Sequence, residues 1–202
     1  MFHDRNDWIS YYRKRMLTPE RVEEYLRIYE PYDKTVEKYC PAPAKTLEIG
    51  CGGARLSTCL SLRGYNVIAT DLNDDILNIG RENGEKYGKN MQFQVMDALK
   101  LADNFPKNSF DVCTHHGVIE HFEKWEIHNM LQQQLEVSEF VIFGLPIKTD
   151  ANLKRFKGDN IYRNLWTLEE WRDNILLPFN IIEIFEVTHK SDDLICVLSS
   201  KT

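Results

Sequence analysis

Residues 47–57 read LEIGCGGARLS, and this stretch decides the fold. A β-rich run leads into the glycines Gly50, Gly52 and Gly53, and a helical pattern follows at once. Glycine tolerates backbone conformations with positive φ and lets the chain approach a ligand closely. The first turn of the next helix presents unpaired N–H groups to an anionic part of such a ligand. The stretch therefore predicts a strand, a turn and a helix, with a ligand bound at the turn.

The same alternation continues along the chain. From about residue 46 onward, short β-rich runs alternate with helical patterns, which is typical of βαβ units and a parallel sheet. Runs rich in Val, Ile and Phe without polar alternation predict strands that are covered on both faces. The last two runs are too close for a crossover helix, so we expect an antiparallel hairpin whose turn uses Ser191, Asp192 and Asp193. The expected strands are residues 46–50, 67–71, 91–96, 110–114, 140–145, 181–187 and 194–200.

Helix boundaries in the core also carry sequence signals. Asn73 is an expected N-cap, and Gly88 is placed to end the helix that Asn73 starts. Thr167 and Glu170 form a capping box for a helix that carries Trp171. These signals predict one helix after the second strand and another before the final hairpin.

The segment before the sheet has helical character. Asn6 or Asp7 is expected to cap a first helix. Thr18 and Pro19 are expected to open a second one, because proline is favoured in the first turn of a helix. We expect Pro31 to end that second helix.

Length and composition fit one enzyme-sized domain, because the chain has 202 residues and 43% of them are apolar. We expect residues 1–202 to form a single domain, with an N-terminal helical cap at 1–45 and an α/β core at 46–202. The segment 147–165 exceeds ordinary connection lengths, which makes it a candidate lid loop.

The charge balance limits the partners. There are 25 Lys and Arg against 31 Asp and Glu, a net charge of −6, whereas binding to a nucleic-acid backbone rests on clustered cations. No window approaches the roughly 20 apolar residues of a membrane span. We therefore expect no nucleic-acid partner and no membrane partner. The cysteines show no CxxC spacing and are expected to be reduced core thiols of a cytoplasmic protein. They are Cys40, Cys51, Cys59, Cys113 and Cys196.

Acidic residues end the next two expected strands. Asp71 follows Gly50 by about 20 residues, the position from which a carboxylate reaches ribose hydroxyls in doubly wound folds. Asp97 ends the third strand, where it could accept a hydrogen bond from an adenine amino group while Ala98 offers backbone contact. Three strand ends thus converge on one edge of the sheet and predict a nucleoside-containing ligand.

Two cofactor classes compete for this site. A dinucleotide fingerprint needs a small residue three positions after its second glycine, and that position is Arg55. The remaining motifs resemble those of the class I S-adenosylmethionine-dependent methyltransferases. The segment EIGCGGA (48–54) is similar to the first motif of that family, with Ala54 in place of its last glycine. SFDVCTHHGVIEHF (109–122) resembles the segment of the family at the fourth strand. The resemblance covers roughly residues 45–200.

The resemblance implies a fold, a reaction and a cofactor site. The fold is a doubly wound, Rossmann-like α/β sheet of seven strands in the order 3-2-1-4-5-7-6, with the last strand antiparallel and helices N-terminal to it. The reaction takes a methyl group from S-adenosylmethionine (SAM) and leaves S-adenosylhomocysteine (SAH). In the family, the glycines line the methionine part of the cofactor, the first acid orders the loop or holds the ammonium group, the second binds the ribose, and the residues after it and after the third strand contact adenine. Carried onto this sequence, the cofactor-binding set is Glu48, Gly50, Cys51, Gly52, Asp71, Leu72, Asp97, Ala98 and His115, the last beside the sulfur.

Histidines gather where the fourth strand ends. An imidazole suits a general base, because its unperturbed pKa is about 6.5. If the acceptor is a hydroxyl, His116 is the first candidate for the base and His121 the second. If the acceptor is a carboxylate, a thiolate or a free amine, no base is required. A metal site is not expected, because adjacent strand residues such as His115 and His116 point to opposite faces.

Two further groups are candidates for substrate binding. Tyr11 and Tyr12, beside Trp8, either close over the site or attach the N-terminal helix to the sheet. Arg163 belongs to a basic segment of the 147–165 loop that either recognises an anionic group of the substrate or is simply solvated.

The sequence thus predicts a methyltransferase that acts on oxygen or nitrogen of a small molecule, as a monomer or a homodimer. Two alternatives stay open. The chain could be an NAD-dependent oxidoreductase on the same sheet, or a noncatalytic cofactor-binding subunit of a methyltransferase complex.

Overall fold

A computed structural model describes residues 5–158, 161–188 and 191–201, with side chains from Trp8 onward. It contains a seven-stranded sheet in the order β3-β2-β1-β4-β5-β7-β6. This order, and the antiparallel β7 between β5 and β6, confirm the fold that the sequence predicts. The strands are β1 (Lys45–Glu48), β2 (Asn66–Asp71), β3 (Met91–Val95), β4 (Phe110–His116), β5 (Ser138–Pro146), β6 (Ile181–Thr188) and β7 (Asp192–Ser199).

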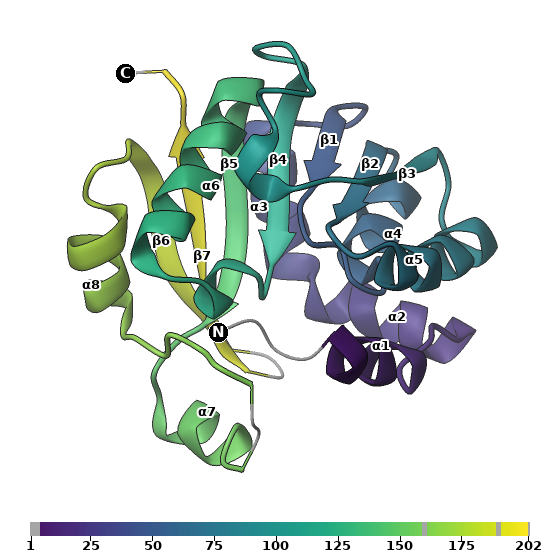
Figure 1. Ribbon diagram of the computed structural model, residues 1–202, viewed down its shortest axis with the longest axis horizontal. Helices are drawn as coiled ribbons and strands as arrows, with labels where there is room; N and C mark the ends of the chain where they lie inside the picture. Colours follow the sequence, from purple (N-terminus) through teal and green to yellow (C-terminus); the bar gives the residue numbers. More distant parts are fainter. Residues whose placement is uncertain (1–4, 159–160, 189–190, 202) are drawn as a thin grey trace.

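The switch point of the sheet lies at β1. This strand pairs in parallel with β2 on one side and with β4 on the other, so that Leu47 is level with both Ile68 and Cys113. In open α/β sheets, ligands bind outside the carboxyl ends of the strands at such a point. Figure 1 shows helices α1 (Arg5–Arg13) and α2 (Pro19–Ile28) beyond the end of the sheet toward which the arrowhead of β4 points.

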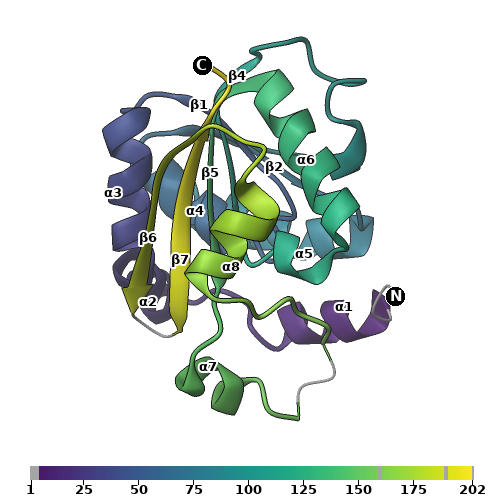
Figure 2. The ribbon, with the colours of Figure 1, turned by 90° about the vertical axis from the view of Figure 1, so that its left-hand side faces the viewer.

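Helices cover both faces of the sheet. Figure 2 shows the sheet nearly edge on, with α3 (Glu30–Tyr39) on one side and α6 (Lys124–Val137) on the other. On one face of the sheet, buried residues of α3 and α4 (Arg55–Leu62) form one cluster with the strands. On the other face, buried residues of α6 form a second cluster with the strands and with Trp171. The central strands are therefore buried on both faces, as their apolar runs predict.

Several capping residues that the sequence predicts do cap helices in the structure. Asn73 caps α5, and its side chain accepts from the backbone N–H of Asp75 at 3.0 Å. Thr18 caps α2, and Thr167 and Glu170 form the expected capping box. The remaining helices are α5 (Asp74–Tyr87), α7 (Asp150–Arg155), α8 (Leu168–Glu170), the 3₁₀ turns η1 (Ala98–Lys100) and η2 (Ile119–His121), and the π-helical turn η3 (Trp171–Leu176).

Two expectations about local structure are wrong. Asn6 and Asp7 are not N-caps, since α1 already includes both. Asp192 and Asp193 do not belong to the turn of the last hairpin, because both lie in β7. Helix α2 ends at Ile28, before Pro31 as expected, and Pro31 lies in the first turn of α3, where its missing N–H costs nothing. Within the 147–165 segment, Thr149 caps the short helix α7. The hairpin between β6 and β7 forms as expected, although residues 189–190 of its turn lie outside the described residues.

In the described part of the chain, no helix is long and apolar enough to cross a membrane. All five cysteines are buried and free, as expected for core thiols.

Candidate functional site

The glycine loop connects β1 to α4 through a series of left-handed residues. Gly50, Gly52 and Ala54 have φ values of +60°, +53° and +52°. The backbone N–H of Cys51 donates to the carbonyl of Thr70 at 2.8 Å, which ties the loop to β2. The loop therefore folds back across the ends of two parallel strands, with its backbone facing the switch point.

Glu48 fastens the start of α4 beneath this loop. Its Oε2 accepts hydrogen bonds from the backbone N–H of Ser57, at 2.9 Å, and from the Ser57 hydroxyl. The carboxyl group is 3% exposed, and this burial raises its pKa to about 8 although the Ser57 hydrogen bonds lower it. The geometry fits the first of the two roles that the resemblance implies for Glu48, ordering of the loop.

Asp71 joins the glycine loop to the end of β2. Its Oδ2 accepts from the N–H of Gly52 at 3.1 Å, and its Oδ1 accepts from the N–H of Asn73 at 3.0 Å. Burial raises the pKa of Asp71 against these backbone hydrogen bonds. Leu72, the next residue, is 64% exposed, so an apolar side chain stands uncovered beside the carboxylate.

The end of β3 lies next to the end of β2. The N–H of Met96 donates to the carbonyl of Asp71 at 3.0 Å, which places Asp97 and Ala98 beyond the same edge. Asp97 begins η1, and its Oδ1 accepts from the N–H of Leu99 at 2.9 Å. Asp97 and Ala98 are both half-buried.

The two histidines at the end of β4 face opposite sides of the sheet. His115 is fully buried and its ring stacks on Phe143 with 5.0 Å between centroids. Burial lowers its pKa to about 3, so the ring is neutral, and neither ring nitrogen has a hydrogen-bond partner among the described residues. His116 instead lies on the α3 side, against Tyr29 and Tyr32. The predicted place of His115 beside the cofactor sulfur stays a prediction.

His116 is paired with a carboxylate that the sequence analysis misses. Its Nε2 lies 3.0 Å from Oδ2 of Asp193, a residue that is 1% exposed. Burial lowers the pKa of His116, but the hydrogen bond and charge of Asp193 outweigh this effect and raise it overall. From the sequence alone, Asp193 is expected only as a turn residue.

A glycine lets the two partners meet. His116 is level with Gly144 of β5, and the intervening strand β5 separates His116 from β7. A Cβ on Gly144 would lie 2.6 Å from Cδ2 of His116, so the imidazole occupies the space that a side chain there would fill. A glycine inside a strand often marks such a close approach. In the sequence, Gly144 was therefore the feature that could have indicated this close approach of His116 to Asp193.

His121 holds two segments together. Its Nδ1 donates to the carbonyl of Tyr162 at 2.7 Å, its Nε2 lies 3.5 Å from Glu120, and its ring lies 5.4 Å from that of Trp8. Because both ring nitrogens face polar partners, His116 is the better placed of the two candidate bases.

Helix α1 covers the glycine loop. The ring of Tyr12 lies so close that a Cβ on Gly52 would be 2.3 Å from its Cζ. Burial raises the pKa of the Tyr12 phenol. Trp8 and Tyr11 pack against Tyr12, at 5.9 Å and 5.2 Å between centroids. The aromatic residues of the N-terminal segment therefore lie at the site.

Asn83 of α5 fixes the chain that leaves α1. Its Oδ1 accepts from the N–H of Leu17, and its Nδ2 donates to the carbonyl of Gly53, both at 2.9 Å. Arg13 adds an ion pair with Glu82 at 2.7 Å. The buried side-chain amide of Asn83 thus links the chain that follows α1 to the glycine loop.

Arg163 packs within its own loop. Its guanidinium lies 4.3 Å from the ring centroid of Phe156 and donates to the carbonyl of Ile161 at 3.3 Å. The following residue, Asn164, donates to the carbonyls of Glu120 and Phe122 at 2.8 and 2.7 Å. The end of the loop is therefore attached to η2, and the role of Arg163 in substrate binding stays a prediction.

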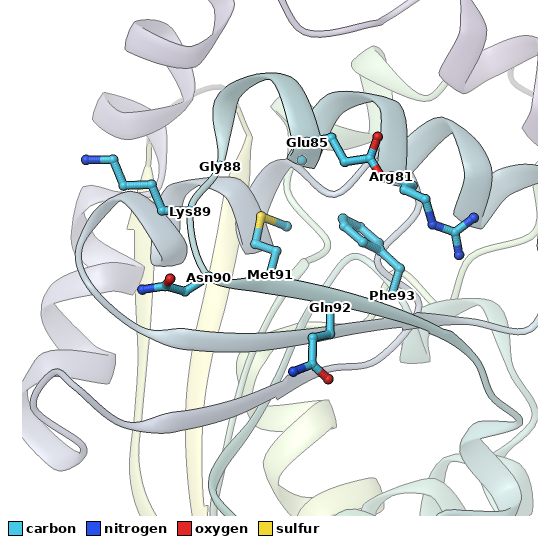
Figure 3. Close-up of a pocket in the computed structure, with 9 residues that line it drawn as sticks. Arg81, Glu85, Gly88, Lys89, Asn90, Met91, Gln92 and Phe93 are labelled. Atoms are coloured by element: carbon cyan, nitrogen blue, oxygen red, sulfur yellow. The ribbon is translucent and has the colours of Figure 1, made fainter.

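A surface hollow of about 440 Å³ lies elsewhere, between the C-terminal half of α5 and the amino end of β3. Figure 3 shows Met91 and Phe93 turned toward the helix that carries Arg81 and Glu85. None of the predicted site residues lines this hollow. Within the described residues, no group of three or more His, Cys, Asp or Glu side chains could hold a metal ion.

Comparison with known proteins agrees with this geometry. Residues 46–139 match the model of a family described as a methyltransferase domain. The match runs from β1 to the start of β5, and the order of all seven strands is the one that the resemblance to class I SAM-dependent methyltransferases predicts. The chain is 36% identical over 77 residues to a ubiquinone biosynthesis O-methyltransferase of Idiomarina loihiensis, and this match covers 38% of the chain and 31% of that protein. The matched segments span about a third of the length of such curated relatives.

Solved structures share the methyltransferase fold. The PH0226 protein of Pyrococcus horikoshii OT3 has a TM-score of 0.70 and 23% identity, over 88% of this chain and 92% of that one. The magnesium protoporphyrin IX methyltransferase of Synechocystis PCC 6803, solved with bound SAH, has a TM-score of 0.68 and 17% identity, over 86% and 82% of the two chains.

Proposed function

We propose that this chain is an enzyme that transfers a methyl group from SAM to an oxygen or nitrogen atom of a small molecule. One observation carries the proposal. The carboxylate of Asp71 bridges the glycine loop and the N-terminus of the next helix at the switch point, with 3.1 Å to the N–H of Gly52 and 3.0 Å to that of Asn73. A carboxylate fixed there by two backbone donors is preorganised to accept from ribose hydroxyls.

The residues around Asp71 fit this cofactor. Leu72 is an uncovered apolar surface of the kind that a flat adenine ring covers. Asp97 and Ala98 lie beyond the neighbouring strand end, where the edge of the base would lie. The lining is acidic, which suits a ligand that carries a sulfonium and an ammonium group. When bound, SAM supplies a methyl group on a positively charged sulfur.

His116 is the proposed general base for a hydroxyl acceptor. Its Nε2 donates to Asp193 in the pair, which leaves Nδ1 as the nitrogen that takes a proton. Nδ1 has no hydrogen-bond partner among the described residues. The carboxylate of Asp193 then stabilises the imidazolium that forms. For an acceptor that needs no base, alignment of the reacting groups by the site is sufficient.

The names of the relatives support a small-molecule acceptor. The ubiquinone biosynthesis O-methyltransferases and the magnesium protoporphyrin IX methyltransferase are named for small molecules. In this chain, Tyr12 and its aromatic neighbours enclose the site, which favours a compact acceptor over a polymer. The name of the curated relatives favours oxygen as the acceptor atom.

The remaining parts of the proposal concern organisation. We infer that residues 1–202 act as one methyltransferase domain, because α1 to α3 pack on the same site and sheet as the core. A monomer or homodimer that works in the cytoplasm is consistent with five buried free thiols, which are typical of a reducing compartment.

Methyl transfer can be tested with [methyl-³H]SAM and panels of hydroxylated and amino-substituted small molecules, by following SAH formation. We expect label in a small-molecule product, and much less with Asp71→Ala at a SAM concentration below saturation. Label found only in RNA or protein would contradict the small-molecule acceptor. SAH binding without turnover on any panel would instead favour the noncatalytic subunit.

A further inference from the structure

A half-buried arginine at the site has buried N–H groups without a partner among the described residues. Arg55 is the first residue of α4 and follows the glycine loop directly. The residue is partly exposed, but its Nε and Nη2 atoms are buried and have no hydrogen-bond partner in the described part of the chain. Within the described residues, no carboxylate lies within 4.0 Å of this guanidinium, although it is a side chain with five N–H donors.

Tyrosine rings surround the guanidinium. Its Cζ lies 5.0 Å from the ring centroid of Tyr25 and 5.8 Å from those of Tyr11 and Tyr12. Tyr29 is also close enough to interact with the charge of Arg55. Ring faces attract a cation, but they do not accept the strong in-plane hydrogen bonds that guanidinium N–H groups make. The cage therefore holds the charge in place without pairing it.

The position of Arg55 connects the two halves of the site. A Cβ on Gly53 would lie 4.0 Å from Nε of Arg55, so the guanidinium lies against the glycine loop. On its other side, Tyr29 packs against the ring of His116, with 5.3 Å between centroids. Arg55 thus lies between the proposed cofactor site and the proposed base.

Burying N–H groups of a cation without an anion is costly, and proteins retain such groups where a ligand supplies the missing charge. Planar guanidinium groups match carboxylates, which accept two parallel hydrogen bonds. We propose that Arg55 binds a carboxylate of a ligand at the glycine loop, beside the tyrosines of α1 and α2. This inference rests on the proposed function, and the carboxylate belongs either to the methyl acceptor or to the amino-acid end of the cofactor.

Calorimetry on the full chain tests the proposal with matched probes. SAH and decarboxylated SAH differ only in the carboxylate, and benzoate and benzamide differ in charge when titrated into the SAH-saturated protein. The variant is Arg55→Gln, and Arg172→Gln is the control, because Arg172 is an exposed arginine that pairs with its neighbour Asp173.

Two outcomes support the proposal. Loss of about tenfold or more in SAH affinity with Arg55→Gln, without loss for decarboxylated SAH, assigns the carboxylate to the cofactor. Unchanged affinity for both nucleosides, with benzoate binding present in the wild type and lost in Arg55→Gln, assigns it to the acceptor. Arg55→Lys keeps the charge and is expected to retain part of the affinity in either case.

Other outcomes overturn it. Equal weakening of SAH and decarboxylated SAH with no change for benzoate, or no change with any probe, shows that Arg55 binds no carboxylate. Thermal melting checks that the variant folds, and we expect a melting temperature at or above that of the wild type, because a half-buried charge without an anionic partner is removed. If the wild type binds neither nucleoside, the proposed function fails, and benzoate and benzamide titrated into the protein without SAH then decide the role of Arg55.

Discussion

The proposed site has two sides, which are built in different ways. We call the side with the glycine loop, Asp71 and Asp97 the cofactor wall. The side with His116, Asp193 and the tyrosines around Arg55 is the acceptor wall. On the cofactor wall, the backbone N–H of Gly52 donates to the side-chain carboxylate of Asp71 at the end of the neighbouring strand. On the acceptor wall, His116 reaches across Gly144 to Asp193, which lies on the far side of another strand. The first wall depends on local turns of two βα units, and the second on side chains brought together by the complete sheet.

This difference has a chemical consequence. The cofactor wall presents groups fixed by the backbone, which suits a ligand common to many enzymes. The acceptor wall presents side chains, namely the imidazole of His116 and the tyrosines around Arg55, which can differ between relatives without changing the fold. Variants on the two walls should therefore separate turnover from cofactor affinity.

The largest expected effect is on turnover, from the acceptor wall. For a hydroxyl acceptor, His116→Ala should lower kcat by roughly 10²- to 10⁴-fold, because general bases contribute about that much. Its SAH affinity should stay near the wild-type value. Kinetics with saturating SAM measure the first quantity and calorimetry the second. His128→Ala is a control, because His128 pairs with the carbonyl of Ile175 away from the site. If His116→Ala lowered SAH affinity as strongly as it lowers turnover, the two walls would not have separate roles.

The next effect is on cofactor affinity. Asp71→Ala removes the acceptor for ribose hydroxyls and for two backbone donors, so SAH binding should weaken by about 1.5–3 kcal/mol. Asp75→Ala is a matched control, because Asp75 lies one turn further along on the exposed side of α5. Isothermal titration provides the measurement. Unchanged affinity in folded Asp71→Ala protein would remove this residue from the cofactor wall.

Gly52 tests how tightly α1 covers the cofactor wall. Gly52→Ala places a methyl group into the ring of Tyr12, so both stability and SAH affinity should fall. Gly64→Ala controls for backbone strain, because Gly64 has φ +98° and only an ordinary contact at 3.8 Å. The free energy of unfolding from urea titration should drop more in Gly52→Ala, where strain and overlap of about 1–3 kcal/mol combine. Adding Tyr12→Ala to Gly52→Ala should restore part of the loss, and equal losses at both glycines would contradict the packing described.

The smallest effect concerns pH. Asp193 raises the pKa of His116, so kcat should fall on acidification at a higher pH than for a free imidazole. Asp193→Asn should move this acidic limb to lower pH. Because the pKa is raised in the folded state, the pair stabilises the protein fully below the unfolded pKa of about 6.5, and the gain is lost as pH rises through the folded pKa.

Gly144→Ala provides an independent test of the same pair. Its methyl group would displace the imidazole without straining the backbone, so the acidic limb should shift in the same direction as in Asp193→Asn. A pH–rate profile that is identical in the wild type and both variants would show that Asp193 does not tune His116.

The positions of the proposed cofactor residues could be predicted because their signals are local. The glycines follow β1, Asp71 ends β2 and Asp97 follows β3, and parallel strands end at the same edge. The sheet order could be predicted only through the family resemblance. The position of Pro31 predicts the end of α2, but not the helix α3 that begins at Glu30, because proline is as compatible with the start of a helix as with its end.

The acceptor wall could not be predicted in the same way. Asp193 follows His116 by 77 positions, and nothing between them predicts that β7 inserts beside β5. Arg55 entered only as a misfit to a dinucleotide fingerprint, since its tyrosine neighbours come from helices that precede the sheet. Gly144 was the one local signal, and its meaning depends on which side chain crosses it.

The central claim is that the glycine loop and Asp71 bind S-adenosyl compounds. The most direct test is a calorimetric titration of the purified chain with SAH and, in parallel, with NAD, since it requires no knowledge of the acceptor. We predict micromolar binding of SAH and no heat from NAD. A clear NAD isotherm, or no heat of binding from SAH, would contradict this claim.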